Sequence, residues 1–269
     1  MKIITKTKKK MEKKNNTIIV VPDVHGRTAW KNVIPYANKE GYEIIFLGDY
    51  HDPYPHEHIS SNDSLKNFKE IIEFRRANDN VTTLIGNHDL GYRFREICQC
   101  RHDYFNGGEV RSLFEDNKDI FDIAAERELD NKKYLFSLAF VRKIWLALSA
   151  LDYPKKDEIE SAGIVNILSD LYHKEDDDFI KSLADFSMFR GGYSSFGSMV
   201  WADVRETLDN DDDVDWGDDI DVKKFNSLND YYQVFGHTMM EKPYISAKCA
   251  CLDVPGKIFK IENGEITEL

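Results

Sequence analysis

Cysteine is scarce in this chain of 269 residues, which contains only four. They form two Cys-x-Cys pairs, Cys98/Cys100 and Cys249/Cys251. The pairs lie far apart in the sequence and lack the two-residue spacer that is common in structural zinc sites. We therefore expect buried, reduced thiols rather than a shared zinc ion.

The sequence also lacks a long apolar run. No stretch approaches the roughly 20 apolar residues that are needed to cross a bilayer. The basic start, Met1 to Lys14, is followed only by the short run Ile18 to Val21, which is no secretory signal. We therefore expect a soluble, cytoplasmic protein with no membrane partner, in which residues 1–16 form a basic, flexible tail.

Positive charge is in deficit, with 36 basic against 48 acidic residues and a formal net charge of -12. Nucleic-acid binding depends on Lys and Arg to neutralise phosphates, so we expect no nucleic-acid partner. An acidic chain that handles phosphate groups needs local positive charge, which bound metal can supply. The length suits one domain, which we place at residues 17–269.

The first third of the chain alternates between strand and helix patterns. Short β-branched runs occur at three places, Thr17 to Val21, Glu43 to Leu47 and Val81 to Ile85. A helical pattern runs from Ser64, a possible N-cap, to Asn78. Such alternation indicates parallel pairing with right-handed crossovers. Ligands of open α/β sheets bind beyond the carboxyl ends of the strands, where Asp23, Asp49 and Asn87 fall.

The second half contains a helical stripe, Ile164 to Leu171, followed by closely spaced strand candidates. These candidates are Tyr232 to Phe235, Tyr244 to Ala247, Ala250 to Val254 and Lys257 to Ile261. Their spacing predicts an antiparallel or mixed second sheet. Two acidic runs, Glu175 to Asp178 and Asp209 to Asp221, are interpreted as solvated surface.

Four polar clusters with a neighbouring glycine each follow an apolar strand. They are Asp23-Val24-His25-Gly26, Gly48-Asp49, Gly86-Asn87-His88-Asp89 and Phe235-Gly236-His237-Thr238. Strand alternation would place Asp23 and His25 on one side. Each cluster has an ordinary structural explanation when taken singly, but together they indicate a common site.

The ligand types at this site indicate a metal centre. Carboxylate, amide and imidazole groups without thiolate suit manganese, iron, zinc or magnesium. Asp49 has two oxygens and could bridge a pair of ions about 3.5–4 Å apart. Two such ions would ionise a water and clamp a phosphoryl group, which predicts direct hydrolysis of a phosphoester.

The motifs D-x-H-G, G-D-x-x-D, G-N-H-D and a late G-H resemble those of the calcineurin-like metallophosphoesterases. The nearest members are the Ser/Thr phosphoprotein phosphatases and the diadenosine tetraphosphate hydrolases. The resemblance implies a four-layer α/ββ/α sandwich of two mixed β-sheets flanked by helices. It also implies two divalent ions, with manganese favoured, and in-line attack of a metal-bound water on a phosphomonoester or phosphoanhydride of protein or nucleotide type.

The same resemblance implies a role for each site residue. Asp23 and His25 would hold the first ion, Asp49 would bridge, and Asn87 and His237 would hold the second. These roles predict that His88 protonates the leaving oxygen. Asp52 would orient His88 through a hydrogen bond.

One metal-binding histidine of the family is missing. It normally lies within a Ser-His-Ala-Gly or a Val-His-Gly-Gly type segment. In the first alignment Leu138 occupies its position, and in the second Arg190 does. We favour the first, because Trp145 follows at the expected spacing. Under either alignment the second metal lacks one imidazole ligand, which should strongly weaken its binding.

Three interpretations follow from this loss. The chain is a hydrolase with a weakened second metal site, or a pseudophosphatase that binds a phosphorylated ligand or partner. In the third, a loop histidine replaces the missing ligand, and the candidates are His51, His56 and His58. Surface positions are the simpler expectation for these three histidines.

The phosphate-binding side of the site also departs from the pattern. Phosphoprotein phosphatases carry Asp-Arg-Gly where this chain has Asp52-Pro53-Tyr54, so one arginine is absent. Arg190 opens a glycine-rich run and could bind phosphate in its place. We expect the aromatic residues of that run, Tyr193, Phe196 and Trp201, to pack in the core. Substrate choice is expected to lie in the helical middle segment and in the run from Arg190 to Trp201.

Overall fold

The computed structural model describes residues 17–97, 101–148, 156–217 and 220–269. The basic tail expected at residues 1–16 and the thiols of Cys98 and Cys100 lie outside these ranges. Cys249 and Cys251 are buried free cysteines, as expected. Within the described ranges, none of the helices has the length and apolar character of a membrane span.

The first sheet has six strands in the order β11-β10-β1-β2-β3-β4. Their bounds are β1 (Thr17–Val21), β2 (Tyr42–Phe46), β3 (Val81–Leu84), β4 (Phe121–Asp122), β10 (Phe259–Glu262) and β11 (Glu265–Glu268). Strands β1 to β4 pair in parallel, which confirms the prediction from the strand and helix alternation. Strand β10 lies antiparallel to β1, with Ile261 opposite Ile18.

The second sheet has the order β5-β6-β7-β9-β8 and is also mixed. Its strands are β5 (Ala125–Leu129), β6 (Lys132–Phe136), β7 (Tyr231–Phe235), β8 (Tyr244–Ile245) and β9 (Cys249–Cys251). The prediction that Lys257 to Ile261 joins this sheet is wrong, because β10 crosses to the first sheet. Local pattern identifies a strand, but its partner is set by distant residues.

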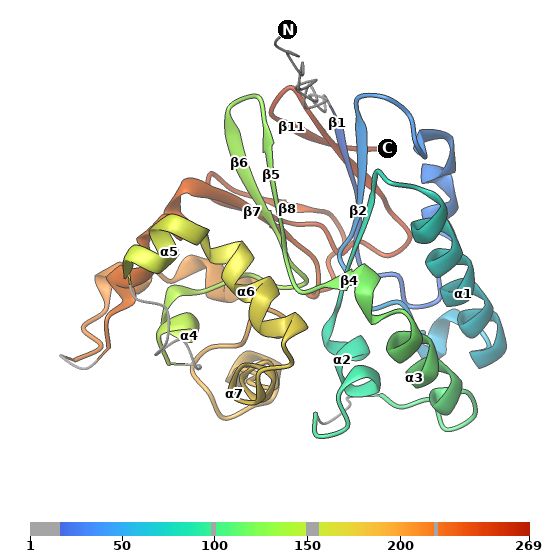
Figure 1. Ribbon diagram of the computed structural model, residues 1–269, viewed down its shortest axis with the longest axis horizontal. Helices are drawn as coiled ribbons and strands as arrows, with labels where there is room; N and C mark the ends of the chain where they lie inside the picture. Colours follow the sequence, from blue (N-terminus) through green and yellow to red (C-terminus); the bar gives the residue numbers. More distant parts are fainter. Residues whose placement is uncertain (1–16, 98–100, 149–155, 218–219) are drawn as a thin grey trace, which may run out of the picture.

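Helices flank the pair of sheets on both sides (Figure 1). Next to the first sheet lie α1 (Ser61–Ala77), α2 (Asn87–Arg93) and α3 (Gly107–Asp116), and next to the second lie α4 (Lys143–Leu148), α5 (Lys156–Ala162), α6 (Ile164–His173) and α7 (Asp177–Ser182). Short 3-10 helices are η1 (Ala29–Tyr36), η2 (Pro55–Glu57), η3 (Lys118–Ile120), η4 (Met188–Arg190), η5 (Val204–Leu208), η6 (Asp211–Asp213) and η7 (Val222–Asp230). The predicted class, two mixed sheets flanked by helices, is confirmed.

Helix α1 begins earlier than predicted. Its N-cap is Ser60, whose hydroxyl oxygen accepts the backbone N–H of Asp63 at 3.0 Å. Ser64 lies inside the helix, fully buried, and its Oγ is 2.9 Å from Nδ1 of His51. Ser60 rather than Ser64 caps the helix, because its extended backbone lets the side chain reach the free N–H groups of the first turn.

Both acidic runs do more than face solvent. In the first, Asp176 caps α7 by accepting the N–H of Phe179 at 3.0 Å. In the second, buried Asp211 accepts from Nε of buried Arg142 at 3.1 Å, and Asp212 pairs with Lys143. The surface interpretation is therefore wrong for Asp211, because a buried cation needs a carboxylate partner. Asp176 is partly exposed and Asp212 is exposed, so it holds for them.

Candidate active site

The five predicted metal ligands meet where the two sheets come together. Asp23 and His25 follow β1, Asp49 follows β2, Asn87 opens α2 after β3, and His237 follows β7 of the second sheet. All five side chains are buried. Beside them lies a cavity of about 370 Å³, lined by His25, Asp49, Tyr54, Asn87, His88, Arg101, Phe189, Arg190, Trp201 and His237.

His25 presents one defined ring nitrogen to the site. Its Nδ1 lies 3.1 Å from the backbone carbonyl of Asp52 and 3.2 Å from that of His51. Carbonyls only accept, so Nδ1 carries the proton and donates it to them. The lone pair of Nε2 then faces Oδ2 of Asp49 at 3.6 Å. Such a backbone contact is the usual way in which proteins orient a metal-binding imidazole.

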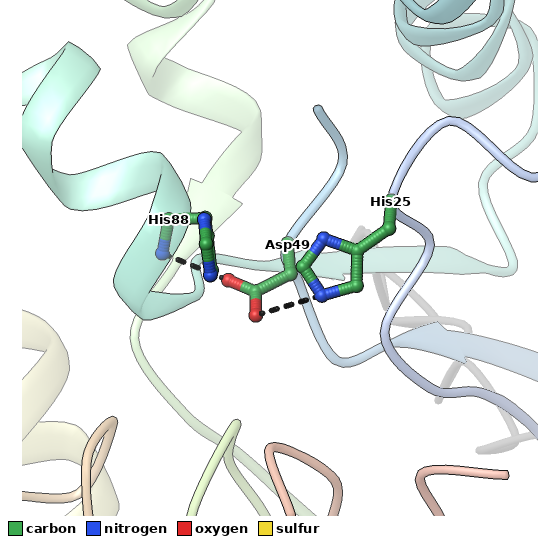
Figure 2. A group of neighbouring side chains, drawn as sticks. All are labelled: His25, Asp49 and His88. Atoms are coloured by element: carbon green, nitrogen blue, oxygen red, sulfur yellow. Dashed lines mark hydrogen bonds and ion pairs between the residues drawn. The ribbon is translucent and has the colours of Figure 1, made fainter. Parts of the chain in front are cut away.

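Asp49 lies between two histidines, as Figure 2 shows. Its Oδ1 accepts the backbone N–H of His88 at 2.9 Å, while Oδ2 faces His25. Potential ligand atoms of His25, Asp49 and His88 lie within 4.8 Å of one another. The carboxylate of Asp89, which has no role in the predicted site, accepts the N–H groups of Asp49 at 2.7 Å and Gly86 at 2.8 Å. It thereby ties the loop after β2 to the start of α2.

His237 connects the second sheet to the ligands of the first. Its Nδ1 lies 3.0 Å from Oδ1 of Asn87. Its backbone N–H donates to both carboxylate oxygens of Asp23, at 2.9 and 3.0 Å. The two sheets therefore supply a joint set of oxygen and nitrogen ligand atoms.

The glycines beside these ligands make room for carboxylates. A Cβ atom on Gly86 would lie 2.1 Å from Oδ1 of Asp49, and one on Gly236 would lie 2.0 Å from Oδ2 of Asp23. Both distances are far below van der Waals contact. Gly86 and Gly236 are thus explained by close packing against Asp49 and Asp23, whereas a Cβ on Gly26 would meet Ser64 and one on Gly48 would meet the backbone of Gly86.

The ligand-bearing loops adopt an uncommon backbone conformation. The φ angles of His25, Asp49, Asp52 and His237 are 45°, 53°, 59° and 64°, in the left-handed region. Non-glycine residues rarely occupy it, and such strain concentrates at functional sites. The predicted strand alternation of Asp23 and His25 is wrong, because β1 ends at Val21 and a left-handed turn directs His25.

The electrostatics of the buried carboxylates fit a divalent cation. Burial raises the pKa of Asp23 to about 6, although the N–H of His237 opposes this. Burial also raises the pKa of Asp49 well above its ordinary value, and the charges of Asp23 and Asp89 add to the effect. Clustered carboxylates of this kind are stabilised in their charged form by a bound ion. Hard oxygen and imidazole donors suit manganese, magnesium, iron or zinc.

His88 and Asp52 form the predicted pair. Nδ1 of His88 donates to Oδ2 of Asp52 at 3.2 Å, and Nε2 lies 3.3 Å from Nη2 of Arg101. Burial lowers the pKa of His88 to about 3, and the positive charges of Arg101 and Arg190 contribute. Burial raises the pKa of Asp52 to about 6, against a hydrogen bond from Tyr92. At neutral pH the free site thus holds a neutral imidazole beside an ionised carboxylate.

Two arginines reach the cavity. Nη2 of Arg190 donates to the carbonyl of His237 at 3.1 Å, and Nη1 lies 3.5 Å from Oδ2 of Asp203. The guanidinium of Arg101 lies 3.9 Å from the ring centre of Tyr54. Sequence reasoning missed Arg101, because the segment that carries it belongs to no recognised motif.

The aromatic residues near Arg190 do not all pack in the core. Tyr193 is fully exposed, so the core prediction is wrong for this residue. Phe196 and Trp201 are partly buried against the core, and Trp201 also lines the cavity. The cavity does include Phe189, Arg190 and Trp201, as expected for the segment thought to govern substrate choice. The helices α4 to α7, the other segment considered, contribute no cavity-lining residue within the described part of the chain.

Leu138 lies where the favoured alignment puts it. It follows β6, is fully buried, and its carbonyl accepts the N–H of Gly236 at 2.8 Å. The competing segment around Arg190 forms the 3-10 turn η4 rather than a strand end. The structure therefore supports Leu138 as the residue in the histidine position.

The loop histidines do not replace the missing ligand in this structure. His51 is buried, not at the surface as expected, and its ring nitrogens contact Ser64 at 2.9 Å and Asp103 at 2.8 Å. His56 and His58 are exposed. None of the three is among the cavity-lining residues of the described chain.

Comparisons with known proteins agree with this geometry. A family model described as calcineurin-like phosphoesterase matches residues 17–240. A mutant of a cold-active protein tyrosine phosphatase is 15% identical, with a TM-score of 0.57 and coverage of 94% of this chain and 77% of that one. The cold-active protein-tyrosine phosphatase of a psychrophilic Shewanella species is 16% identical, with a TM-score of 0.51 and the same coverage. Comparison with curated protein sequences finds no match.

Fold and site thus define a metal-dependent phosphoester hydrolase scaffold. The chain belongs to the calcineurin-like phosphoesterase family.

Proposed function

We propose that this chain hydrolyses phosphomonoesters or phosphoanhydrides of protein or nucleotide type in the cavity between the two sheets. One observation carries the proposal. The same cavity contains candidate metal ligands, a histidine held by a carboxylate, and the two guanidinium groups of Arg101 and Arg190. A phosphoryl group requires all three kinds of partner.

The proposed metal roles are those that the family resemblance implies. Asp23 and His25 would hold the first ion, Asp49 would bridge, and Asn87 and His237 would hold the second. The donors, oxygen and imidazole without thiolate, suit manganese, iron, zinc or magnesium. Among these we favour manganese on the family resemblance. Bound ions would supply the positive charge that polarises the phosphoryl group and activates the attacking water.

His88 is suited to protonate the leaving group. On substrate binding, His88 would first take up a proton at Nε2. As the water oxygen forms its bond to phosphorus, the ester P–O bond breaks, the leaving oxygen takes this proton, and the proton released by the water passes to solvent. Nδ1 stays hydrogen-bonded to Asp52, which holds the ring in place. A bound phosphate anion would offset the charges of Arg101 and Arg190, two of the causes that lower the His88 pKa.

The arginines are suited to bind the phosphate itself. Arg190 is held by the carbonyl of His237 and by Asp203, so its guanidinium is fixed before substrate arrives. Arg101 reaches the cavity beside His88, where it could supply the contact that Pro53 cannot. Two guanidinium groups match the charge of a phosphate dianion.

A second function, phosphate binding without turnover, is favoured by Leu138. Its side chain is fully buried, and Leu138 is the residue that we align with the missing metal-binding histidine. A second ion with too few ligands would be weak, and the chain would then bind a phosphorylated ligand or partner without hydrolysing it.

The test uses metal-stripped protein reloaded with manganese and assayed with 4-nitrophenyl phosphate. Turnover that requires manganese and falls in His88→Ala would support the hydrolase. Absence of turnover, combined with calorimetric binding of inorganic phosphate that Arg190→Ala weakens, would support the binding protein. Absence of both would contradict both functions.

A further inference from the structure

The hydroxyl group of Tyr92 joins two parts of the active site. Tyr92 is fully buried, and its O–H donates to Oδ1 of Asp52 at 2.6 Å. The same oxygen accepts the backbone N–H of Asp103 at 2.9 Å. A carboxylate oxygen can only accept and a backbone N–H can only donate, so the Tyr92 hydroxyl must donate to Asp52 and accept from Asp103.

Asp52 receives a different partner on each carboxylate oxygen. Oδ2 accepts from Nδ1 of His88, and Oδ1 accepts from Tyr92. His88 and Tyr92 are four residues apart on α2, so both side chains lie on one helix face. Two partners on one face fix the plane of the carboxylate, and with it the direction of the His88 ring.

The other contact of Tyr92 is with the segment that carries Arg101. His102 stacks on the Tyr92 ring, with ring centroids 5.4 Å apart, and the backbone N–H of Asp103 donates to the Tyr92 hydroxyl oxygen. Asp103 in turn contacts His51 and Ser61. Arg101, the first residue of this anchored segment, lies beside Nε2 of His88.

We propose that Tyr92 is a positioning residue, which sets the geometry of the His88–Asp52 pair and docks the Arg101 segment against it through one hydroxyl group. The proposal rests on the function proposed above and assigns a role to a residue outside its reacting groups. Tyr92 acts through Asp52, so its loss should matter most where the leaving oxygen needs a proton.

The kinetic test compares Tyr92→Phe with the control Tyr50→Phe in the full, manganese-loaded chain. Tyr50 is also a buried tyrosine whose O–H donates, at 2.7 Å, but to the carbonyl of Leu84, away from Asp52. We expect Tyr92→Phe to lower kcat for phenyl phosphate by about ten- to a hundredfold, the range for a hydrogen bond to a charged group. The loss for 4-nitrophenyl phosphate should be smaller, because its leaving oxygen needs less protonation.

A double mutant separates positioning from general damage. Because Tyr92 acts through His88, Tyr92→Phe should cause little further loss in a His88→Ala background. Equal losses for both esters, a similar loss in Tyr50→Phe, or additivity with His88→Ala would each overturn the proposal.

A spectroscopic readout tests Tyr92 even if the chain turns nothing over. In magnesium-loaded protein, the Nδ1 proton of His88 should give a low-field NMR resonance, assigned by its loss in His88→Ala. We expect this proton to exchange with water at least about tenfold faster in Tyr92→Phe, and at an unchanged rate in Tyr50→Phe, because only the former frees the Asp52 carboxylate. An unchanged exchange rate in Tyr92→Phe would overturn the proposal. Missing turnover alone would count only against the hydrolase.

Discussion

The carbonyl of Leu138 accepts a hydrogen bond from the N–H of Gly236 at 2.8 Å, one residue before the predicted ligand His237. The residue that we align with the missing histidine is thus held directly beside a predicted ligand of the second ion. Its backbone makes the contact that links β6 to the turn after β7, while its side chain packs in the core. The scaffold around the missing imidazole is therefore intact.

Leu138→His should strengthen binding of the second manganese ion by at least about ten- to a hundredfold. Without metal, the buried imidazole should lower the free energy of unfolding by about 1–3 kcal/mol, because it lacks a partner. Manganese should restore the free energy of unfolding, since an ion that binds only the folded state stabilises that state. Calorimetric titration and thermal unfolding with and without manganese measure both effects. Leu138→Met is the matched control, and equal manganese binding by the two variants would contradict the assignment.

His88→Ala should lower kcat for aryl phosphates by about 10²–10⁴-fold, the usual contribution of a general acid. Manganese binding should change little, because the role assigned to His88 is proton transfer. The assay is steady-state hydrolysis next to calorimetric metal binding. His56→Ala, a change at an exposed histidine, serves as the control. Loss of manganese together with activity would instead show that His88 is a metal ligand, which its place beside Asp49 allows.

Arg190→Ala should weaken competitive inhibition by inorganic phosphate by about ten- to a hundredfold, as expected for the loss of a charged hydrogen bond. Arg205→Ala provides a matched control. Arg205 also pairs with Asp203, at 2.7 Å, yet it does not line the cavity. Similar inhibition constants for the wild type and Arg190→Ala would show that Arg190 serves structure alone.

Gly236→Ala should weaken manganese binding, because the new Cβ would displace the carboxylate of Asp23. In Gly108→Ala the added methyl meets nothing within 4 Å. Gly108 lies in helix α3, so this control should leave metal binding unchanged and stabilise the fold by up to about 1 kcal/mol. Wild-type metal affinity in Gly236→Ala would mean that Asp23 does not hold an ion.

Asp103 should add stability that is lost in acid. Burial alone would raise its pKa, but hydrogen bonds from Ser61 and His51 lower it from 3.8 to about 2. As pH falls, the Asp103 carboxylate is therefore protonated at a higher pH in the unfolded chain than in the folded chain. The stabilisation is complete above about pH 4 and disappears as pH falls toward 2. Thermal unfolding from pH 6 downward should show a difference in Tm between the wild type and Asp103→Asn that becomes smaller below pH 4. A difference in Tm that does not change with pH would contradict the lowered pKa.

The sequence alone determined the strands that carry the candidate site and the residue types gathered there. Runs such as Thr17 to Val21 are apolar on both faces, which requires a buried strand. A glycine accompanies each polar cluster in the sequence, and for Gly86 and Gly236 the structure gives the reason in their close contacts with Asp49 and Asp23. The sequence also indicated that Leu138 stands in place of a histidine, because the neighbouring residues match the family motif.

Only the tertiary structure decided which residues complete the site. Arg101 and Tyr92 belong to no sequence pattern, and only the fold brings Arg101 to His88 and Tyr92 to Asp52. The placement of β10 in the first sheet and the burial of Asp211 against Arg142 were likewise decided by partners far away in the chain. Local periodicity reports which face of an element is buried. The partner of a polar side chain depends on which distant segments the fold brings within hydrogen-bond reach.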